Sequence, residues 1–550
     1  MKMSWLALAG VILLSFTAKA SNSTIDSFDS REATIDGVHN ALFSGITTCR
    51  DVVSSFLSRV ETFNPSINSI ISLNPNALNI AEEMDARIAA GNVTGSLFCI
   101  PILLKDNYDT LELPTTGGCL DLADNKPTVD AAAVFALKNA GAIILGKTNL
   151  HEFALEGLTV SSLGGQTINP YDFTRTPGGS SGGTGAAIAS SFSVFGTGSD
   201  TVNSLRSPAS ANSLFSFRPT RGLISRSGII PVSYTQDAIG PIARNVKDLA
   251  VALTVMASIG FDPLDNTTSL RPPSLSRVDY SRDTIGGSLR GLKFGLLEGM
   301  FNHTSSNETT PVNDVMSHMV TVLQNAGVEI IPIAESVYNS TALSASLDVQ
   351  APEFREDMNA YLQTQSLNGS HHSTLGQVYT SRKFLVIPSQ YSFVETALHS
   401  STSNSSYAPT KLGIQNLTTT LQTTFSANAL DAIIYPEQKN LVVKIGSPSQ
   451  IGRNGILAAL TGYPVVTIPA GFSPPTDDAL IGVPIGMEIL GLPWSESKLI
   501  NIASHISALM HVRRMPSFAN ISVEVNSYSS VPTITPDSGN IPSAYPIGVY

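Results

Sequence analysis

The sequence predicts an α/β fold, because stretches with helical periodicity alternate with short apolar runs typical of buried strands. Residues 49–63 (CRDVVSSFLSRVETF) and 77–91 (ALNIAEEMDARIAAG) each place apolar side chains on one helix face, and Gly91 is a suitable C-terminal cap. Residues 99–107 (CIPILLKDN) combine an apolar run with a polar ending, as expected of a buried strand that leads into a loop.

The alternation continues along the chain. Residues 130–149 (DAAAVFALKNAGAIILGKTN) predict a helix that Asp130 caps and Gly141 ends, followed by a strand. Residues 185–200 (GAAIASSFSVFGTGSD) predict a helix and then a strand, and residues 459–506 predict two strands and a helix.

Two segments differ from this pattern in composition. Residues 270–430 are rich in serine, threonine and glycosylation sequons, and we interpret them as a variable layer over the core. Residues 516–550 are rich in proline and serine with little periodicity, so a C-terminal tail is expected there.

Composition excludes several classes of partner. The chain of 550 residues has a formal net charge of −11 and no basic stripe, so a nucleic-acid partner is not expected. Apolar residues make up 42% of the chain, which is ample for a large core, and no stretch after the N-terminus is apolar enough for a stable membrane span. There is no C-x-x-C or H-E-x-x-H pattern, so no metal site is predicted.

Residues 1–20 (MKMSWLALAGVILLSFTAKA) have the pattern of a secretory signal peptide. The basic Lys2 precedes an apolar run over 5–16, which is too short to span a bilayer comfortably, and the segment ends in an A-x-A cleavage signal. Cleavage is therefore expected after Ala20, and the mature protein is expected to be secreted or to lie in the secretory-pathway lumen.

Ten N-x-[S/T] sequons are a second, independent indication of the secretory pathway. Chance produces a few in any chain rich in serine and threonine, but ten is many. The sequence therefore predicts a glycoprotein, with candidate glycosylation sites at Asn22, Asn92, Asn266, Asn302, Asn307, Asn339, Asn368, Asn404, Asn416 and Asn520.

Cysteine usage is light, with only Cys49, Cys99 and Cys119. An odd number in an oxidising compartment favours one disulfide and one leftover thiol, although three buried free cysteines are an equal alternative. The sequence does not determine the pairing. We take Cys99–Cys119 as the candidate disulfide, because these two residues bracket a segment of interest.

The stretch TPGGSSGGTG at 176–185 is the most unusual local pattern. Gly178-x-Ser180-x-Gly182 formally matches a nucleophile elbow, but an elbow follows a strand, whereas the preceding NPYDFTRTPGG is polar and broken by prolines. No histidine lies in a context typical of a triad partner, and Gly183 is followed by threonine rather than the lysine of a phosphate-binding loop. Because a helix and a strand follow directly, we interpret the stretch as a loop inside the core.

A lysine is the alternative base for a serine nucleophile, because burial can depress the lysine pKa until the neutral amine accepts a proton. Lys105 and Lys147 each follow a short apolar run. Lysines at such positions are more commonly exposed strand ends, and local chemistry does not choose between the two.

Motifs along most of the chain resemble those of the amidase signature family. GGSSGGTG at 178–185 and GSDTVNSLRSPA at 198–209 are similar to the family's adjacent glycine- and serine-rich blocks. Further similar segments are FRPTRGLISRSGIIPVSYTQDAIGPIAR at 217–244, IPILLKDN at 100–107, TGYPVVTIPAG at 461–471 and GVPIGMEILG at 482–491. The resemblance covers roughly residues 30–512 and is weakest across 270–430.

The resemblance implies a Ser-cisSer-Lys triad, with Lys105 as base, Ser180 as the bridging serine and Ser204 as nucleophile. Backbone N–H groups of the 201–204 stretch would form the oxyanion hole. The implied residues of that hole are Thr201, Val202, Asn203 and Ser204, and the implied supporting residues are Ser181, Asp200 and Arg206.

The implied fold is a single α/β/α domain over 21–515, built around a large mixed, twisted sheet, with no metal or organic cofactor. Residues 270–430 would lie on the substrate side. The implied reaction is hydrolysis of the C–N bond of a small-molecule carboxylic amide through an acyl-enzyme. We expect a secreted, fungal-type amidase, while fatty-acid amides and peptide amides both stay open as substrates, as does the oligomeric state.

Val202-Asn203 departs from the family's usual Gly-Gly before the nucleophile. A β-branched valine tolerates positive φ poorly, so either the loop keeps ordinary backbone angles or the site is impaired. An impaired site would make the chain a binding protein on an amidase fold. An A-type subunit of a tRNA-dependent amidotransferase is a further alternative, which the signal peptide and the sequons disfavour.

Overall fold

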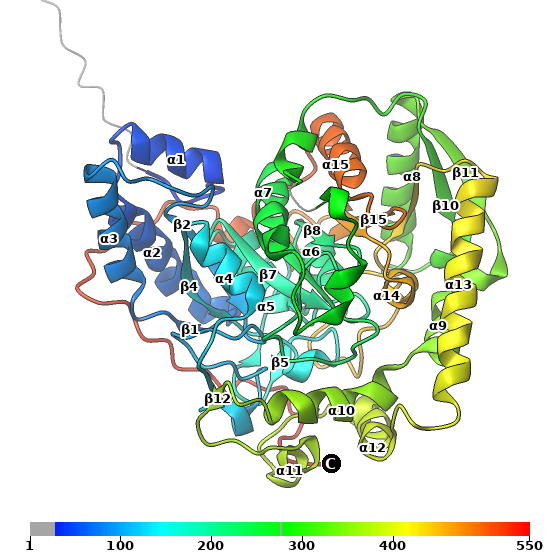
Figure 1. Ribbon diagram of the computed structural model, residues 1–550. Helices are drawn as coiled ribbons and strands as arrows, with labels where there is room; N and C mark the ends of the chain where they lie inside the picture. Colours follow the sequence, from blue (N-terminus) through cyan, green and yellow to red (C-terminus); the bar gives the residue numbers. More distant parts are fainter. Residues whose placement is uncertain (1–27, 276–277) are drawn as a thin grey trace, which may run out of the picture.

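The computed structural model describes residues 28–275 and 278–550; the expected signal peptide, its cleavage site and the sequon at Asn22 lie outside the described residues. The chain folds around a sheet of eleven strands (Figure 1). In spatial order these strands are β1 (Ile70–Leu73), β4 (Ala142–Thr148), β2 (Ile100–Lys105), β7 (Phe195–Asp200), β9 (Ala238–Ala243), β8 (Phe215–Arg218), β14 (Val465–Phe472), β15 (Pro484–Leu490), β13 (Ala432–Pro436), β10 (Lys293–Leu297) and β11 (Glu329–Ile333).

The sheet is mixed in direction. Strand β2 is parallel to both β4 and β7, and β10 is parallel to both β11 and β13, whereas the central strands from β7 to β13 pair antiparallel. The expected α/β class with a large mixed sheet is therefore confirmed. Two small antiparallel pairs lie outside this sheet, β3 (Lys126–Pro127) with β12 (Leu367–Asn368) and β5 (Val160–Ser161) with β6 (Gly165–Gln166).

Helices cover both faces of the sheet. Helix α5 (Gly182–Ala189) and helix α7 (Val246–Met256) both pack against β7 and β9, from opposite faces. On the face of α7 lie α4 (Ala132–Asn139) and α15 (Glu496–Met510), and α5 contacts α6 (Arg206–Ala211) on the other. The glycine- and alanine-rich helix α5 is completely buried, because its small side chains allow close approach to the strands.

The N-terminal elements follow the expected pattern. Helix α1 (Ile35–Phe43) precedes α2 (Cys49–Ile67), whose apolar face is buried, and α3 (Ala77–Ala89), which Gly91 follows at a φ of +72°. Asp130 is an exception, since α4 begins without a side-chain cap and the Asp130 carboxylate binds Lys138 Nζ at 2.9 Å instead. Because α4 begins at Ala132 with Ala131 at the N-cap position, Asp130 lies one residue too early to cap it, and its carboxylate accepts from the backbone N–H of Leu111 at 2.9 Å.

The 270–430 segment is more than an outer layer, because it adds β10 and β11 to one edge of the sheet. Its helices α8 and α9 to α13 form the right edge and the base of the molecule in Figure 1. They are α8 (Thr310–Asn325), α9 (Ser340–Leu347), α10 (Gln350–Leu362), α11 (Leu375–Thr380), α12 (Tyr391–His399) and α13 (Tyr407–Ala427). Helix α9 packs against α13 and α14 (Ile456–Thr461), which brings it towards the centre of the molecule.

The segment 516–550 has almost no regular secondary structure, as expected, but it is not a detached tail. It crosses the surface from α2 to the C-terminus beside α11 (Figure 1). Arg59 of α2 donates to the carbonyl oxygen of Ala519 at 2.6 Å, and the side chain of Tyr545 is 2% exposed. The segment is therefore part of the folded domain.

The structure corrects the cysteine pairing. Cys49 at the start of α2 is bonded to Cys99, whereas Cys119 is a buried free thiol whose Sγ lies 3.3 Å from the carbonyl oxygen of Lys383. The candidate pair Cys99–Cys119 is wrong, because the packing of α2 places Cys49 beside the start of β2. Within the described part of the chain, no helix is both long and apolar enough to cross a membrane.

Candidate active site

Lys105 ends β2, and its side chain is completely buried. Its Nζ donates hydrogen bonds to Ser180 Oγ at 2.6 Å and to Ser199 Oγ at 2.8 Å. Because β2 and β7 are parallel neighbours, the alternating side chains Thr197 and Ser199 of β7 face Lys105. Among the described residues, the amine therefore meets only hydroxyl groups within hydrogen-bond distance.

Burial lowers the pKa of Lys105 to about 7, although the nearby Asp200 and Asp237 carboxylates partly oppose the shift. A lysine with such a pKa is neutral in about half of the molecules at pH 7, so it can accept a proton there.

The glycine-rich loop presents Ser180 to this amine. The peptide bond between Gly179 and Ser180 is cis, and the Ser180 carbonyl accepts a hydrogen bond from the His151 backbone N–H at 3.0 Å. Glycine is required for close approach: a Cβ atom at Gly178, whose φ is +70°, would lie 2.9 Å from the carbonyl oxygen of Ser207. The glycines thus pack a loop into the core, as the sequence predicted.

The 201–204 loop connects β7 to α6. None of its residues has a positive φ, so the valine and asparagine stay in ordinary backbone space. Its carbonyl groups are all held by donors: Gln236 Nε2 binds Thr201, Arg206 Nη2 binds Val202, and the backbone N–H of Ser207 binds Asn203 at 2.8 Å. The fourth carbonyl, that of Ser204, accepts from the backbone N–H of Ser181 at 3.3 Å.

In contrast to these carbonyl groups, the backbone N–H groups of the 201–204 loop have no hydrogen-bond acceptor among the described residues. They are the N–H groups of Thr201, Val202, Asn203 and Ser204. Ser204 is 6% exposed and faces a cavity. Anchored carbonyl groups beside unpaired N–H groups are the arrangement that an oxyanion hole requires.

A network of buried ion pairs lies next to the 201–204 loop. Arg206 bridges Asp200 at 3.0 Å and Glu488 at 2.8 Å, and Arg218 contacts Asp200 at 2.7 Å. Burial alone would favour the neutral form of Asp200, but the two guanidinium groups hold its pKa at about 2. Asp200 also accepts from the backbone N–H of Leu205 at 3.1 Å, which ties the charge network to the loop.

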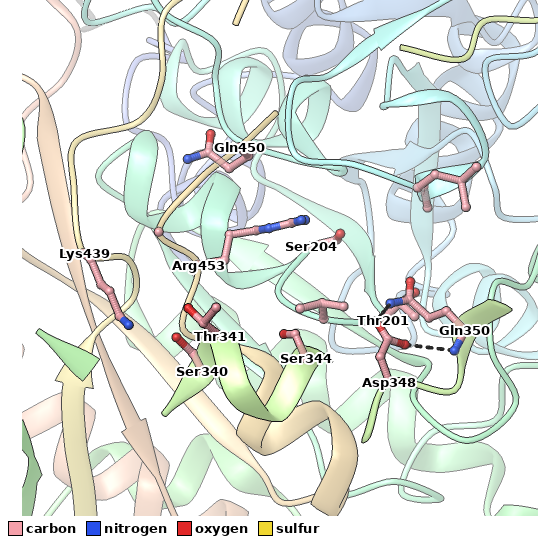
Figure 2. A pocket seen from close by; sticks show the side chains of 14 residues that line it. Thr201, Ser204, Ser340, Thr341, Ser344, Asp348, Gln350, Lys439, Gln450 and Arg453 are labelled. Carbon is pink, nitrogen blue, oxygen red and sulfur yellow. Dashed lines mark hydrogen bonds between the residues drawn. The ribbon is translucent and has the colours of Figure 1, made fainter. Parts of the chain in front are cut away.

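The cavity beside Ser204 has a volume of about 260 Å³ and a mainly polar lining (Figure 2). Thr201, Val202 and Ser204 line one part of it. The 270–430 segment contributes Ser340, Thr341, Ser344, Asp348 and Gln350, and the loop before α14 contributes Lys439, Gln450 and Arg453. In Figure 2 the Arg453 side chain extends towards Ser204, and a hydrogen bond joins Asp348 to Gln350.

Several predicted residues therefore come together. Lys105 contacts Ser180, the backbone of Ser181 contacts Ser204, and Asp200 pairs with Arg206. Lys147 is also completely buried, but it is held by the Asp106 carboxylate and by the backbone oxygens of Tyr108 and Pro114. The expectation that such lysines are exposed strand ends is wrong for both.

Sequence reasoning missed Ser199 and the cavity residues. Ser199 could have been found, because it lies two positions after Thr197 on the predicted strand and therefore shares a face with it. The cavity residues carry no local signal, since they come from segments that meet only in the folded chain.

Comparison with known proteins identifies the family. The family model described as "Amidase" matches residues 51–500, so the chain belongs to the amidase family. The native peptide amidase of Stenotrophomonas maltophilia has a similar structure, with a TM-score of 0.78 and 30% identity over 88% of this chain and 99% of that one.

Curated relatives agree with this family. The A-type subunit of glutamyl-tRNA(Gln) amidotransferase from Prochlorococcus marinus is 30% identical over 497 residues, which cover 87% of this chain and 98% of the relative. A probable amidase of Arabidopsis thaliana is 29% identical over 527 residues, with coverages of 93% and 97%. These relatives are bacterial and plant proteins, and the fungal-type origin stays a prediction.

Proposed function

We propose that this protein is an amidase that hydrolyses the C–N bond of a small, polar carboxylic amide, with Ser204 as nucleophile, Ser180 as proton relay and Lys105 as base. The observation that carries the proposal is the buried Lys105 amine, which donates to Ser180 Oγ at 2.6 Å. A neutral amine at this position can draw a proton from Ser204 through Ser180 while Ser204 attacks the carbonyl carbon.

The 201–204 loop would stabilise the negative charge that develops on the carbonyl oxygen. Its N–H groups are held in place before substrate binds, so no reorganisation is needed during the reaction. Collapse of the tetrahedral intermediate breaks the C–N bond, and Ser180 returns the proton to the departing amine. Water then repeats the sequence on the acyl-enzyme and releases the acid.

The cavity supports a small polar substrate. Its volume is about 260 Å³, and its lining includes Arg453, Lys439 and Asp348 rather than a wide apolar wall. A long acyl chain would desolvate these charged groups without offering them a hydrogen bond, which is costly. Amides that carry hydroxyl, carboxylate or amino groups therefore suit the cavity better than fatty-acid amides.

We also propose that the protein is secreted and N-glycosylated. Of the nine sequon asparagines within the described residues, eight are exposed and Asn302 is half-buried, which suits enzymatic glycan attachment. Expression in a eukaryotic secretory host followed by N-glycosidase treatment tests this. We expect a loss of mass on deglycosylation and a mature N-terminus at Ser21, and an unprocessed, unglycosylated product would contradict the proposal.

Labelling with a fluorophosphonate probe, followed by peptide mass spectrometry, tests the catalytic roles. We expect an adduct on Ser204 that is lost in Lys105→Ala. An adduct on Ser180 would exchange the roles of the two serines. Absence of any adduct in a well-folded sample would instead favour a binding protein without catalysis.

The 30% identity to the A-type subunit of an amidotransferase supports a second candidate, in which ammonia from glutamine is passed to a partner enzyme. Hydrolysis of L-glutamine and of a panel of small amides by the isolated chain distinguishes the two. Turnover of the panel without glutamine preference supports the hydrolase, whereas activity with glutamine that requires added partner subunits supports the second candidate.

A further inference from the structure

Asn203 occupies a position where the family usually has glycine, and its side chain is completely buried. Its Nδ2 donates to Glu437 Oε1 at 3.0 Å, although the two residues are 234 positions apart. Gly455 makes room for this side chain, since a Cβ atom there would lie 2.5 Å from Asn203 Cβ. The Asn203 side chain therefore has a hydrogen-bond partner in Glu437, and the absence of a side chain at Gly455 leaves space for it.

Glu437 follows β13 directly, is 0% exposed, and makes no ion pair within the described part of the chain. The charged groups that face it are Glu488 of β15, Arg206 of α6 and Asp200 of β7. Arg206 and Arg218 already balance the carboxylates of Asp200 and Glu488. An ionised Glu437 would be a third buried negative charge without a cation.

Burial and the neighbouring Glu488 raise the pKa of Glu437 to about 8. A neutral carboxyl group has one O–H donor, which needs a hydrogen-bond acceptor, and the Asn203 carboxamide has an acceptor available. Within the described residues, Glu437 Oε2 and Asn203 Oδ1 are buried and have no hydrogen-bond partner. A carboxylic acid and a carboxamide are complementary, because each offers one donor and one acceptor.

We propose that Glu437 is a positioning residue, whose neutral carboxyl group pairs with the Asn203 carboxamide and holds the 201–204 loop in its oxyanion-binding conformation. This inference rests on the proposed amidase function. Glu437 touches neither substrate nor reacting atoms, and acts only through Asn203.

Loss of the Glu437 proton brings two acceptor oxygens, Oε2 and Oδ1, to face each other without a hydrogen between them. Asn203 is then repelled and the loop loses its anchor. Activity should therefore fall at high pH for a reason that lies outside the triad.

A double-mutant cycle tests the pairing. We expect Glu437→Ala to lower kcat by about 10²-fold with a much smaller change in KM, because the loop donors lose their alignment. Glu437→Gln offers the same donor and acceptor, so it should keep kcat within a few-fold and lose the fall at high pH. In an Asn203→Gly background, Glu437→Ala should cost little more. Equal losses in both backgrounds, or an inactive Glu437→Gln, would overturn the proposal.

Glu496→Gln is the matched control. Glu496 is also a buried glutamate, but it lies on α15 and accepts from the backbone N–H of Thr220 at 2.8 Å. We expect this variant to keep both kcat and the high-pH behaviour of the parent protein. A similar change in both glutamine variants would point to a general loss of stability and would contradict a specific role for Glu437.

A measurement without substrate separates this inference from the proposed function. Between the unfolded pKa of about 4.3 and the raised folded value, the folded state holds a proton that the unfolded state has lost. Stability of the parent protein therefore falls as pH rises through this range, and Glu437→Gln lacks this contribution. We expect the Tm advantage of Glu437→Gln over the parent to grow from pH 5 to pH 8.

A constant Tm difference would show that Glu437 is ionised and would overturn the proposal even if the amidase is active. If instead the fluorophosphonate adduct is missing while the Tm difference grows, the proposed function fails and the acid–amide pair stands.

Discussion

Lys105 differs from the other buried lysine in its surroundings. Lys147 pairs with Asp106, whereas Lys105 contacts the hydroxyl groups of Ser180 and Ser199. Burial lowers the pKa of both amines. The Asp106 carboxylate in contact with Lys147 opposes this shift, whereas the hydroxyl partners of Lys105 carry no charge that would oppose it. The sequence placed both lysines after similar apolar runs, so this difference arises entirely from the neighbours.

The pH dependence of activity follows from the Lys105 pKa of about 7. The base works only when neutral, so kcat/KM should rise with pH through about 7 and then level off before the high-pH fall assigned to Glu437. Lys105→Met should lower kcat/KM by roughly 10²–10⁴-fold and abolish the rise. A pH–rate profile measures both.

The control for this prediction is Lys138→Met, because Lys138 lies on α4 and pairs with Glu112 and Asp130. The variant should keep the parent profile. A rise centred near pH 7 that persists in Lys105→Met would show that another group is the base.

Arg453 is the residue with the clearest expected effect on substrate binding. It pairs with Glu156 at 3.0 Å and extends towards Ser204 (Figure 2). Arg453→Met should raise KM for amides with a carboxylate or hydroxyl group about tenfold or more, because a hydrogen bond to a charged group contributes about 1.5–3 kcal/mol. Steady-state kinetics with matched polar and apolar amides measures this, and an equal change for both substrates would contradict it.

At the scale of elements, the disulfide joins the start of α2 to the residue before β2. It closes a sequence separation of 50 residues, which restricts the unfolded chain. The paired substitution Cys49→Ala and Cys99→Ala should lower the free energy of unfolding by about 2–4 kcal/mol. Thermal unfolding with and without reductant measures the effect.

In this experiment Cys119→Ala serves as the control, because the thiol is free. It should keep the sensitivity of Tm to reductant, which the double variant should lose. Reductant sensitivity that disappears in Cys119→Ala alone would contradict the Cys49–Cys99 pairing.

The strands also explain why the triad forms where it does. Parallel pairing of β2 with β7 brings the end of one strand beside the hydroxyl-bearing face of the other. The sequence predicted both strands and their order along the chain, but neither their adjacency nor their direction. These depend on crossover connections that local periodicity does not encode.

At the scale of the molecule, the segment 516–550 packs on the surface from α2 to α11 (Figure 1). Truncation after Met515 removes two backbone acceptors of the buried Arg59, at Ala519 and Ile521. Loss of these partners should cost on the order of 1–3 kcal/mol, and exposure of the surface under Tyr545 should add to it. The truncated protein should unfold at a lower Tm and be cleaved faster by protease.

Tyr545→Phe provides a graded comparison, since it removes only the hydrogen bond from the phenol to the Ser447 carbonyl. Its cost should be about 1 kcal/mol, well below that of the truncation. A truncated protein with the parent Tm would show that the segment contributes nothing to stability.

The sequence by itself determined the local elements and the chemistry of the site. Period and composition predicted α2, α3, β2 and β4, and the motif resemblance assigned roles to Lys105, Ser180 and Ser204. These features depend on residues that are close together in the sequence, or on motifs that lie within one short stretch. The sequence did not determine the backbone angles at Val202 and Asn203, because both ordinary and positive φ were compatible with it.

Only the tertiary structure decided which distant groups meet. It joined Cys49 to Cys99, set Glu437 against Asn203, and brought Arg453 and α9 to the cavity. It also showed that the loop keeps ordinary backbone angles, with Asn203 hydrogen-bonded to Glu437 and packed against Gly455. The physical reason is common to all: pairing, burial and the resulting pKa values depend on which surfaces pack together, and packing is a property of the whole fold.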